Sequence, residues 1–122
     1  MGTDKVVELK PENIGMAKAG PRTVLTPRES LTYKTCDSLR AVFDDCLAES
    51  KIEIVLDCKA VSFMDSKALE LLLTIQDELR HRGGMLKLVG LNAVCRDIFL
   101  ATRLINVLHV YEDIFAAIRG QS

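Results

Sequence analysis

Residues 51–69 read KIEIVLDCKAVSFMDSKAL, and this stretch decides the fold class. Its first part, residues 51–56, is apolar at positions 52, 54, 55 and 56, which predicts a strand that passes from half-buried to fully buried. Residues 57–63 are expected to carry the chain across to a loop that ends at Asp65-Ser66, where a helix begins. A buried strand that leads into a helix is typical of an α/β fold.

The sequence on both sides of this stretch continues the alternation of strands and helices. Helices are indicated by apolar residues at helical spacing, and their ends by capping residues and glycines. The expected elements are a strand at 23–25 stopped by Pro27, a helix opening at Cys36 or Asp37, a helix from about Ser66 to Arg82 ended by Gly83-Gly84, a strand at 85–91, a helix capped by Asn92, a strand at 107–111 and a short helix capped by Asp113. We therefore predict one α/β domain with a mostly parallel sheet of four to five strands and about four helices.

The first residues are harder to interpret. Residues 1–22 are expected to be an N-terminal strand or arm, and residues 23–122 the domain proper. Val6, Val7 and Leu9 indicate a short edge strand, after which Pro11, Gly15, Gly20 and Pro21 are expected to break the pattern.

Composition excludes several classes of function. The 122 residues carry 16 Lys+Arg against 17 Asp+Glu, a net charge of −1, so we expect no direct contact with nucleic acid and none with an acidic membrane surface. The sequence holds neither a membrane-spanning apolar run nor a signal peptide, which predicts a cytoplasmic protein. The four cysteines are widely spaced, which favours reduced, buried thiols over a metal site or a disulfide.

The candidate site is the helix start at Asp65-Ser66. A helix N-terminus offers unpaired N–H groups and tolerates a phosphate. On a helical wheel Ala68, Leu71, Leu72, Ile75 and Leu79 form the expected core face, whereas Leu69 and Leu73 lie at its margin. Ser66, Leu69, Glu70 and Leu73 share one strip, which suits docking of a partner protein. The spacing alone favours the simpler interpretation, a plain N-cap at Asp65 or Ser66 with the two leucines covering a neighbouring loop.

The sequence gives little support for catalysis. His81 lies at the far end of the helix that Ser66 begins, about 22 Å away at 1.5 Å per residue. No G-x-S-x-G elbow surrounds Ser66, and neither a P-loop nor a G-x-G-x-x-G motif occurs. We therefore expect a protein that is not an enzyme and needs no cofactor.

The chain resembles a known family over roughly residues 36–118. The stretch Ile54-Val55-Leu56-Asp57, followed by Val61-Ser62-Phe63-Met64-Asp65-Ser66, looks like the signature of STAS domains, in particular of anti-sigma factor antagonists. The resemblance continues through residues 79–90 (LRHRGGMLKLVG) and the following helix and strand, and the order of elements agrees.

The resemblance implies a role in transcription regulation. Proteins of this kind bind an anti-sigma factor that is also a serine kinase, and so release the sigma factor. The kinase phosphorylates the serine after the Asp, which ends the interaction, and a phosphatase resets the switch. Carried over by position, the phosphoacceptor is Ser66 and its neighbour is Asp65. Lys67, Leu69, Glu70 and Leu73 complete the expected partner-binding set.

The chain departs from the family pattern in three places. Lys67 and Ala68 stand where the family usually has Ser or Thr and then Gly, and Arg28-Glu29-Ser30-Leu31 with Thr32 replaces the earlier Gly-Glu/Asp-Leu-Asp motif. A constitutive STAS scaffold subunit of a signalling or transport complex therefore stays open as an alternative. A homodimer or an assembly with other STAS domains stays open as well.

Overall fold

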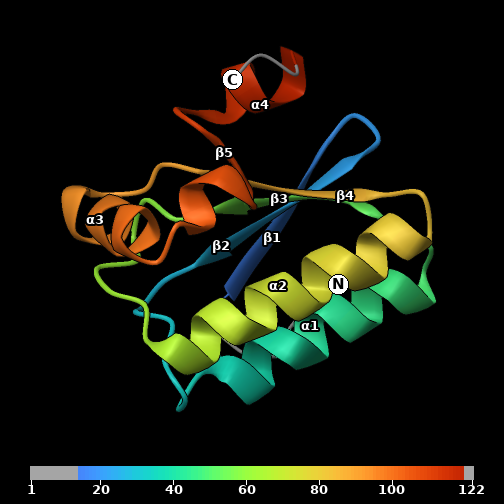
Figure 1. Cartoon of the computed structure of the whole chain (residues 1–122). Coiled ribbons are helices and arrows are strands. Elements are labelled where there is room, and N and C mark those ends of the chain that lie inside the picture. The colour runs from blue at the N-terminus through green and yellow to red at the C-terminus, as the bar shows by residue number, and fades with distance from the viewer. Residues whose placement is uncertain (1–13, 120–122) are drawn as a thin grey trace.

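Strands and helices alternate along the chain, as the sequence predicts (Figure 1). The structure is a computed structural model and describes residues 14–119. Its elements are β1 (Ile14–Ala19), β2 (Arg22–Pro27), α1 (Cys36–Ala48), β3 (Glu53–Asp57), α2 (Ser66–His81), β4 (Met85–Val89), α3 (Ala93–Ala101), the 3-10 helix η2 (Leu104–Asn106), β5 (His109–Tyr111) and α4 (Ile114–Arg119).

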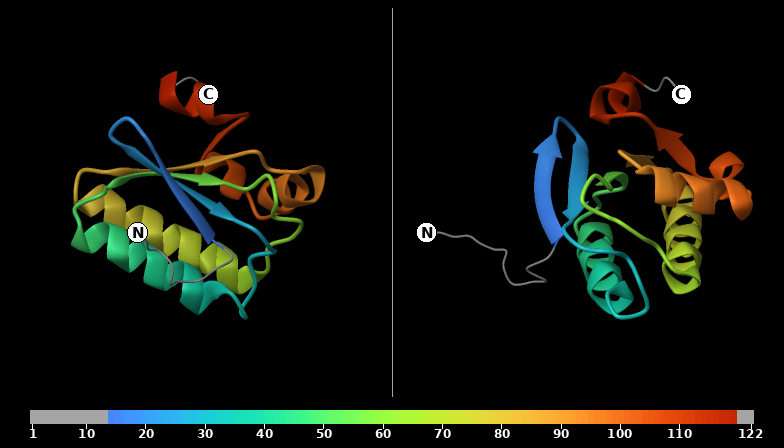
Figure 2. Two further views of the ribbon diagram at one scale, coloured as in Figure 1. Left: turned by 180° about the vertical axis from the view of Figure 1, so that it is seen from behind. Right: turned by 90° about the vertical axis from the view of Figure 1, so that its left-hand side faces the viewer.

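The strands form one five-stranded sheet in the order β1-β2-β3-β4-β5. β1 pairs antiparallel with β2, and the other neighbours run parallel. Helices α1 and α2 lie side by side on one face of the sheet, and α4 lies on the opposite face (Figure 2). The prediction of a single α/β domain with a mostly parallel sheet is thereby confirmed.

Alternation along the central strands divides the apolar residues between two clusters. Ile54, Leu56, Leu86 and Leu88 point toward α1 and α2 and belong to the main core. The intervening Val55 and Val89 join Val24, Tyr111 and Ala117 beneath α4. Residues 54–57 of β3 are therefore buried on both faces, which explains its apolar run, whereas Glu53 and Met85 at the strand starts stay exposed.

Three of the sequence predictions need correction, each for a local reason. Residues 14–19 form a strand despite Gly15, because a tight turn at Gly20 (φ +66°) folds them back onto β2. β4 ends at Val89 rather than at residue 91, since Gly90 (φ +74°) turns the chain. β5 begins at His109 rather than at residue 107, because the N–H groups of Val107 and Leu108 donate back to the carbonyl of Leu104 in η2. Val6, Val7 and Leu9 lie outside the described residues.

The four thiols differ in exposure, and this predicts their reactivity. All four are free; Cys46, Cys58 and Cys95 are buried, and Cys36 is half-buried. We expect an aromatic disulfide reagent to label only Cys36 in the native protein and all four after denaturation, as counted by mass spectrometry. Labelling of all four thiols in the native protein would contradict this prediction.

Burial raises the pKa of Cys46 from 9.0 to about 11. Because a buried thiolate is disfavoured, Cys46 should lower stability only as the pH rises above 9.0 toward about 11, and Cys46→Ala should reduce that loss.

Candidate functional site

The loop between β3 and α2 is fixed at both ends before it reaches the candidate serine. At its start, Oδ1 of Asp57 accepts a hydrogen bond from the backbone N–H of Lys59 at 3.1 Å. Val61 and Met64 are both only 1% exposed and anchor the loop in the core. The helix start that follows is thus held by the body of the protein rather than by a free loop.

Asp65 is the N-cap of α2, and both of its carboxylate oxygens are engaged. Oδ1 accepts the backbone N–H of Ala68 at 3.0 Å, and Oδ2 accepts the backbone N–H of Tyr33 at 2.8 Å. The first bond caps the helix, and the second ties the β2–α1 connection to it. Of the two capping residues that the sequence left open, the structure assigns the role to Asp65.

Backbone pairing reinforces the link between these two loops. The N–H of Leu31 donates to the carbonyl of Phe63 at 3.0 Å, and the N–H of Asp65 donates to the carbonyl of Leu31 at 3.1 Å. This parallel bridge places Tyr33, whose side chain is 66% exposed, beside the start of α2. Tyr33 is the residue of this region that sequence reasoning missed, because it lies between the predicted strand at 23–25 and the predicted helix start at Cys36 or Asp37.

Ser66 is the first residue of α2 and is exposed. Within residues 14–119 its hydroxyl makes no hydrogen bond, since Asp65 performs the capping. Ser66 is therefore open to solvent and takes no part in capping the helix.

The strip that includes Ser66 is less apolar at its surface than the helical wheel predicts. Glu70 is exposed and Leu73 is half-buried, but Leu69 is only 8% exposed and packs in the main core. Conversely Leu71, which was expected to face the core, is half-buried. The placement of Leu69 at the margin of the core face is thus wrong: the buried side of α2 is rotated toward the position of Leu69. As a partner contact Leu69 stays a prediction, with little surface to offer.

The comparison with protein families decides where this fold belongs. The STAS domain model matches residues 13–117, which includes the β3–α2 loop and Ser66. This chain belongs to the STAS family. A comparison with curated protein sequences found no significant match.

Solved structures with the same STAS fold come from several bacteria. A candidate anti-sigma factor antagonist from Thermotoga maritima has 22% identity and a TM-score of 0.83, with 88% of this chain and 92% of that chain covered. The phosphorylated form of the Bacillus cell fate determinant SpoIIAA has 19% identity and a TM-score of 0.66, covering 88% and 99%. A sulfate transporter family protein from Wolinella succinogenes has 20% identity and a TM-score of 0.69, covering 80% and 81%. At these identities the likeness concerns the fold alone.

A shallow hollow of about 320 Å³ in this STAS domain is lined by Lys67, the residue that follows Ser66. It lies between the N-terminal halves of α1 and α2, and its lining comes from both. Partial burial, followed by the charges of Asp65 and Asp37, raises the pKa of the Cys36 thiol in its wall. The lining residues are Tyr33, Cys36, Asp37, Lys67, Glu70, Leu71 and Thr74.

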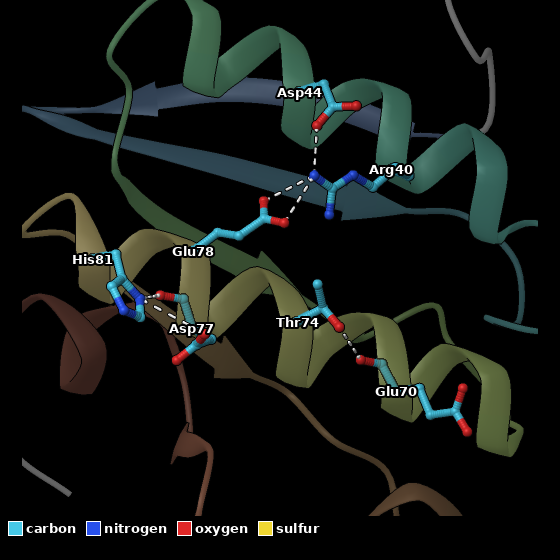
Figure 3. A network of polar contacts seen from close by, with 7 residues as sticks. All are labelled: Arg40, Asp44, Glu70, Thr74, Asp77, Glu78 and His81. Carbon is cyan, nitrogen blue, oxygen red and sulfur yellow. Dashed lines mark hydrogen bonds and ion pairs between the residues drawn. The ribbon is translucent and has the colours of Figure 1, made fainter.

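Farther along the same two helices, Arg40 connects α1 to α2 (Figure 3). Its Nη2 donates to both carboxylate oxygens of Glu78, at 2.8 and 3.1 Å, and lies 3.0 Å from Asp44 on its own helix. The side chains of Arg40 and Glu78 are 33% and 36% exposed, so solvent screens part of this attraction.

The network predicts a measurable coupling between the helices. A double-mutant cycle with Arg40→Met and Glu78→Gln should give a coupling energy of about 1 kcal/mol in urea unfolding. The matched cycle with Asp44→Asn should give about 0.4 kcal/mol, because that pair is an exposed i,i+4 contact within one helix. Additive effects of Arg40→Met and Glu78→Gln would show that the cross-helix pair contributes nothing.

Other chemistry finds little support near the serine. His81 ends α2, and its Nδ1 lies 2.8 Å from the carbonyl oxygen of Asp77, while His109 is exposed on β5. In the part of the chain that the structure describes, no cluster of three or more His, Cys, Asp or Glu residues suits a metal ion. Nor does any helix between residues 14 and 119 have the length and apolar character to span a membrane.

Proposed function

We propose that this STAS domain binds an anti-sigma factor that is also a serine kinase, and that phosphorylation of Ser66 ends the interaction. Binding would hold the anti-sigma factor and leave its sigma factor free. A phosphatase would restore the binding form. The proposed contact surface consists of Ser66, Lys67, Glu70 and Leu73, and Asp65 and Leu69 support it from below.

The observation that carries the proposal is the division of labour between Asp65 and Ser66. Asp65 supplies both hydrogen bonds that the helix start and the neighbouring loop need. The exposed hydroxyl of Ser66 has no structural duty in the described chain and can accept a phosphoryl group without unmaking the cap. The fold shared with the phosphorylated form of SpoIIAA supports the same view.

A phosphate at Ser66 would change the surface chemistry sharply. It would bring about 1.5 to 2 negative charges to a strip that already holds the exposed carboxylate of Glu70. A partner that packs against Leu73 would then have to bury or face those charges. Desolvation and repulsion from partner carboxylates would both oppose binding.

A constitutive scaffold is the second candidate function. It is favoured by Lys67 and Ala68, which replace the usual residues after the Asp-Ser pair, and by the fold shared with a sulfate transporter family protein. In that case Ser66 would carry no phosphate, and the chain would remain in one large assembly under all growth conditions.

Purification of the tagged chain from its own cells tests these two functions. We expect a serine protein kinase of an anti-sigma system to co-purify, and intact mass with fragment spectra to place one phosphoryl group at Ser66 in part of the material. Ser62, exposed in the same loop, serves as the internal control and should stay unmodified. An unmodified chain in a constant complex without a kinase would favour the scaffold.

A further inference from the structure

A second hollow lies on the face of the sheet that α1 and α2 do not cover, which we call the open face. Its volume is about 200 Å³, and it lies where β3 and β4 begin. Val55 and Lys87 project from this face, since Val55 packs against Ala117 of α4 and Lys87 bonds to the same residue. Helix α4 is only six residues long and covers part of this face (Figure 2), so the exposed Met85 and Glu53 remain at the hollow.

Two cationic side chains line this open-face hollow, and neither is fully engaged. Nζ of Lys87 donates to the carbonyl of Ala117 at 2.6 Å and lies 5.3 Å from the ring centre of Tyr111. Among residues 14–119 no carboxylate lies within ion-pair distance of this half-buried ammonium. An ammonium has three donors, so two of the three remain available.

The contacts of Arg22 are longer than those of Lys87. Its Nη2 donates to the carbonyl of Ile118 at a long 3.4 Å, and its Nε lies 3.8 Å from Glu53, whose side chain is 51% exposed. An exposed pair at that distance contributes little, so most of the guanidinium fork is free. The lining thus has two cations against one solvent-exposed carboxylate.

The remaining walls suit a small anion with an apolar part. Gly83 and Gly84 border the hollow and place no side chain in it, while Val55 and Met85 give it an apolar floor and rim. A half-buried lysine with spare donors is best compensated by an anionic ligand, because charge-assisted hydrogen bonds are stronger where water is excluded.

We propose that the open-face hollow binds a phosphate-bearing small molecule, with Lys87 and Arg22 holding the phosphate and Met85 contacting the apolar part of the ligand. The site lies across the sheet from Ser66 and does not depend on the proposed phosphorylation switch. Lys87 and Arg22 can donate to the C-terminal carbonyls of α4 and hold the phosphate at the same time, because each keeps unused donors.

Amide chemical shifts under titration test the site on the full chain. Inorganic phosphate, added against sodium chloride of equal ionic strength, should shift Gly83, Gly84 and Lys87 saturably in the millimolar range. Butyl phosphate should bind about tenfold more tightly, because its chain covers Met85. Equal binding of the two would assign the site to free phosphate and still support the phosphate contacts.

Variants separate this site from nonspecific charge effects. Lys87→Met and Arg22→Gln should each weaken binding at least about tenfold, and Glu53→Gln should tighten it, since it removes a competing carboxylate. Lys18→Met, which removes an exposed charge on β1, should change nothing. Because Lys87→Met can loosen α4, Arg22→Gln with unshifted Ala117 and Tyr111 signals is the deciding variant. Shifts that do not saturate, or that survive in Arg22→Gln, would overturn the proposal.

Discussion

Aspartate in place of Ser66 is expected to weaken binding to the anti-sigma kinase about a hundredfold, whereas alanine should leave the affinity within about threefold of the original. The difference arises because Asp places a negative charge beside Glu70 on the proposed contact surface, and Ala removes only a hydroxyl that makes no hydrogen bond in residues 14–119. Titration calorimetry with the purified kinase, without nucleotide hydrolysis, measures both affinities directly.

The fold itself supplies a control for this experiment. Ser66 is the first residue of α2, where a negative side chain interacts favourably with the helix dipole by about 0.5 kcal/mol. The Ser66→Asp variant should therefore keep its thermal stability while its affinity for the kinase falls. Unfolding is then excluded as the cause of the weaker binding. Ser62→Asp adds the same charge to an exposed position earlier in the loop and should retain binding better. If the Asp and Ala variants at position 66 bind alike, the charge-gated switch is refuted.

The fold could be predicted from sequence because its signals are local and agree with one another. The apolar run of β3 and the cap at Asp65 each mark an element without reference to the rest of the chain. The strand expected within residues 1–22 was not placed at β1, because the strand character of β1 comes from pairing with β2 and its exposed residues have no alternating apolar pattern. A glycine inside a strand is interpreted as the end of that strand as long as the partner strand is unknown.

The candidate site was only partly predictable, because two of its features depend on tertiary contacts. The wheel of α2 could not show that its buried side turns toward Leu69, which joins the main core while Leu71 lines the same hollow as Lys67. No pattern in the sequence around Tyr33 predicts that its N–H donates to the carboxylate of Asp65, 32 positions away. Helical periodicity finds a face, but its orientation is decided by which neighbours pack against it.

Alanine at Gly84 is expected to cost about 3 kcal/mol of unfolding free energy, whereas alanine at Gly83 should cost about 1 kcal/mol. A Cβ at Gly84 would overlap the carbonyl oxygen of Ile52 and stand 2.6 Å from its Cβ, so the backbone has to move. A Cβ at Gly83 meets nothing within 4 Å, and its penalty comes only from φ +81°. Urea unfolding of the two single variants measures both values.

The contrast between these adjacent glycines follows from the junction of α2 with the sheet. The N–H of Met85 donates to the carbonyl of Ile52 at 2.9 Å, which begins the β3–β4 ladder at the very oxygen that a side chain at Gly84 would displace. The N–H of Gly84 also closes α2 onto the carbonyl of Leu79 at 2.7 Å, so the chain cannot withdraw without opening the helix end. Gly83→Ala disturbs neither bond. Equal losses in the two variants would mean that the junction yields freely, and that close packing of Gly84 against Ile52 does not hold β4 beside β3.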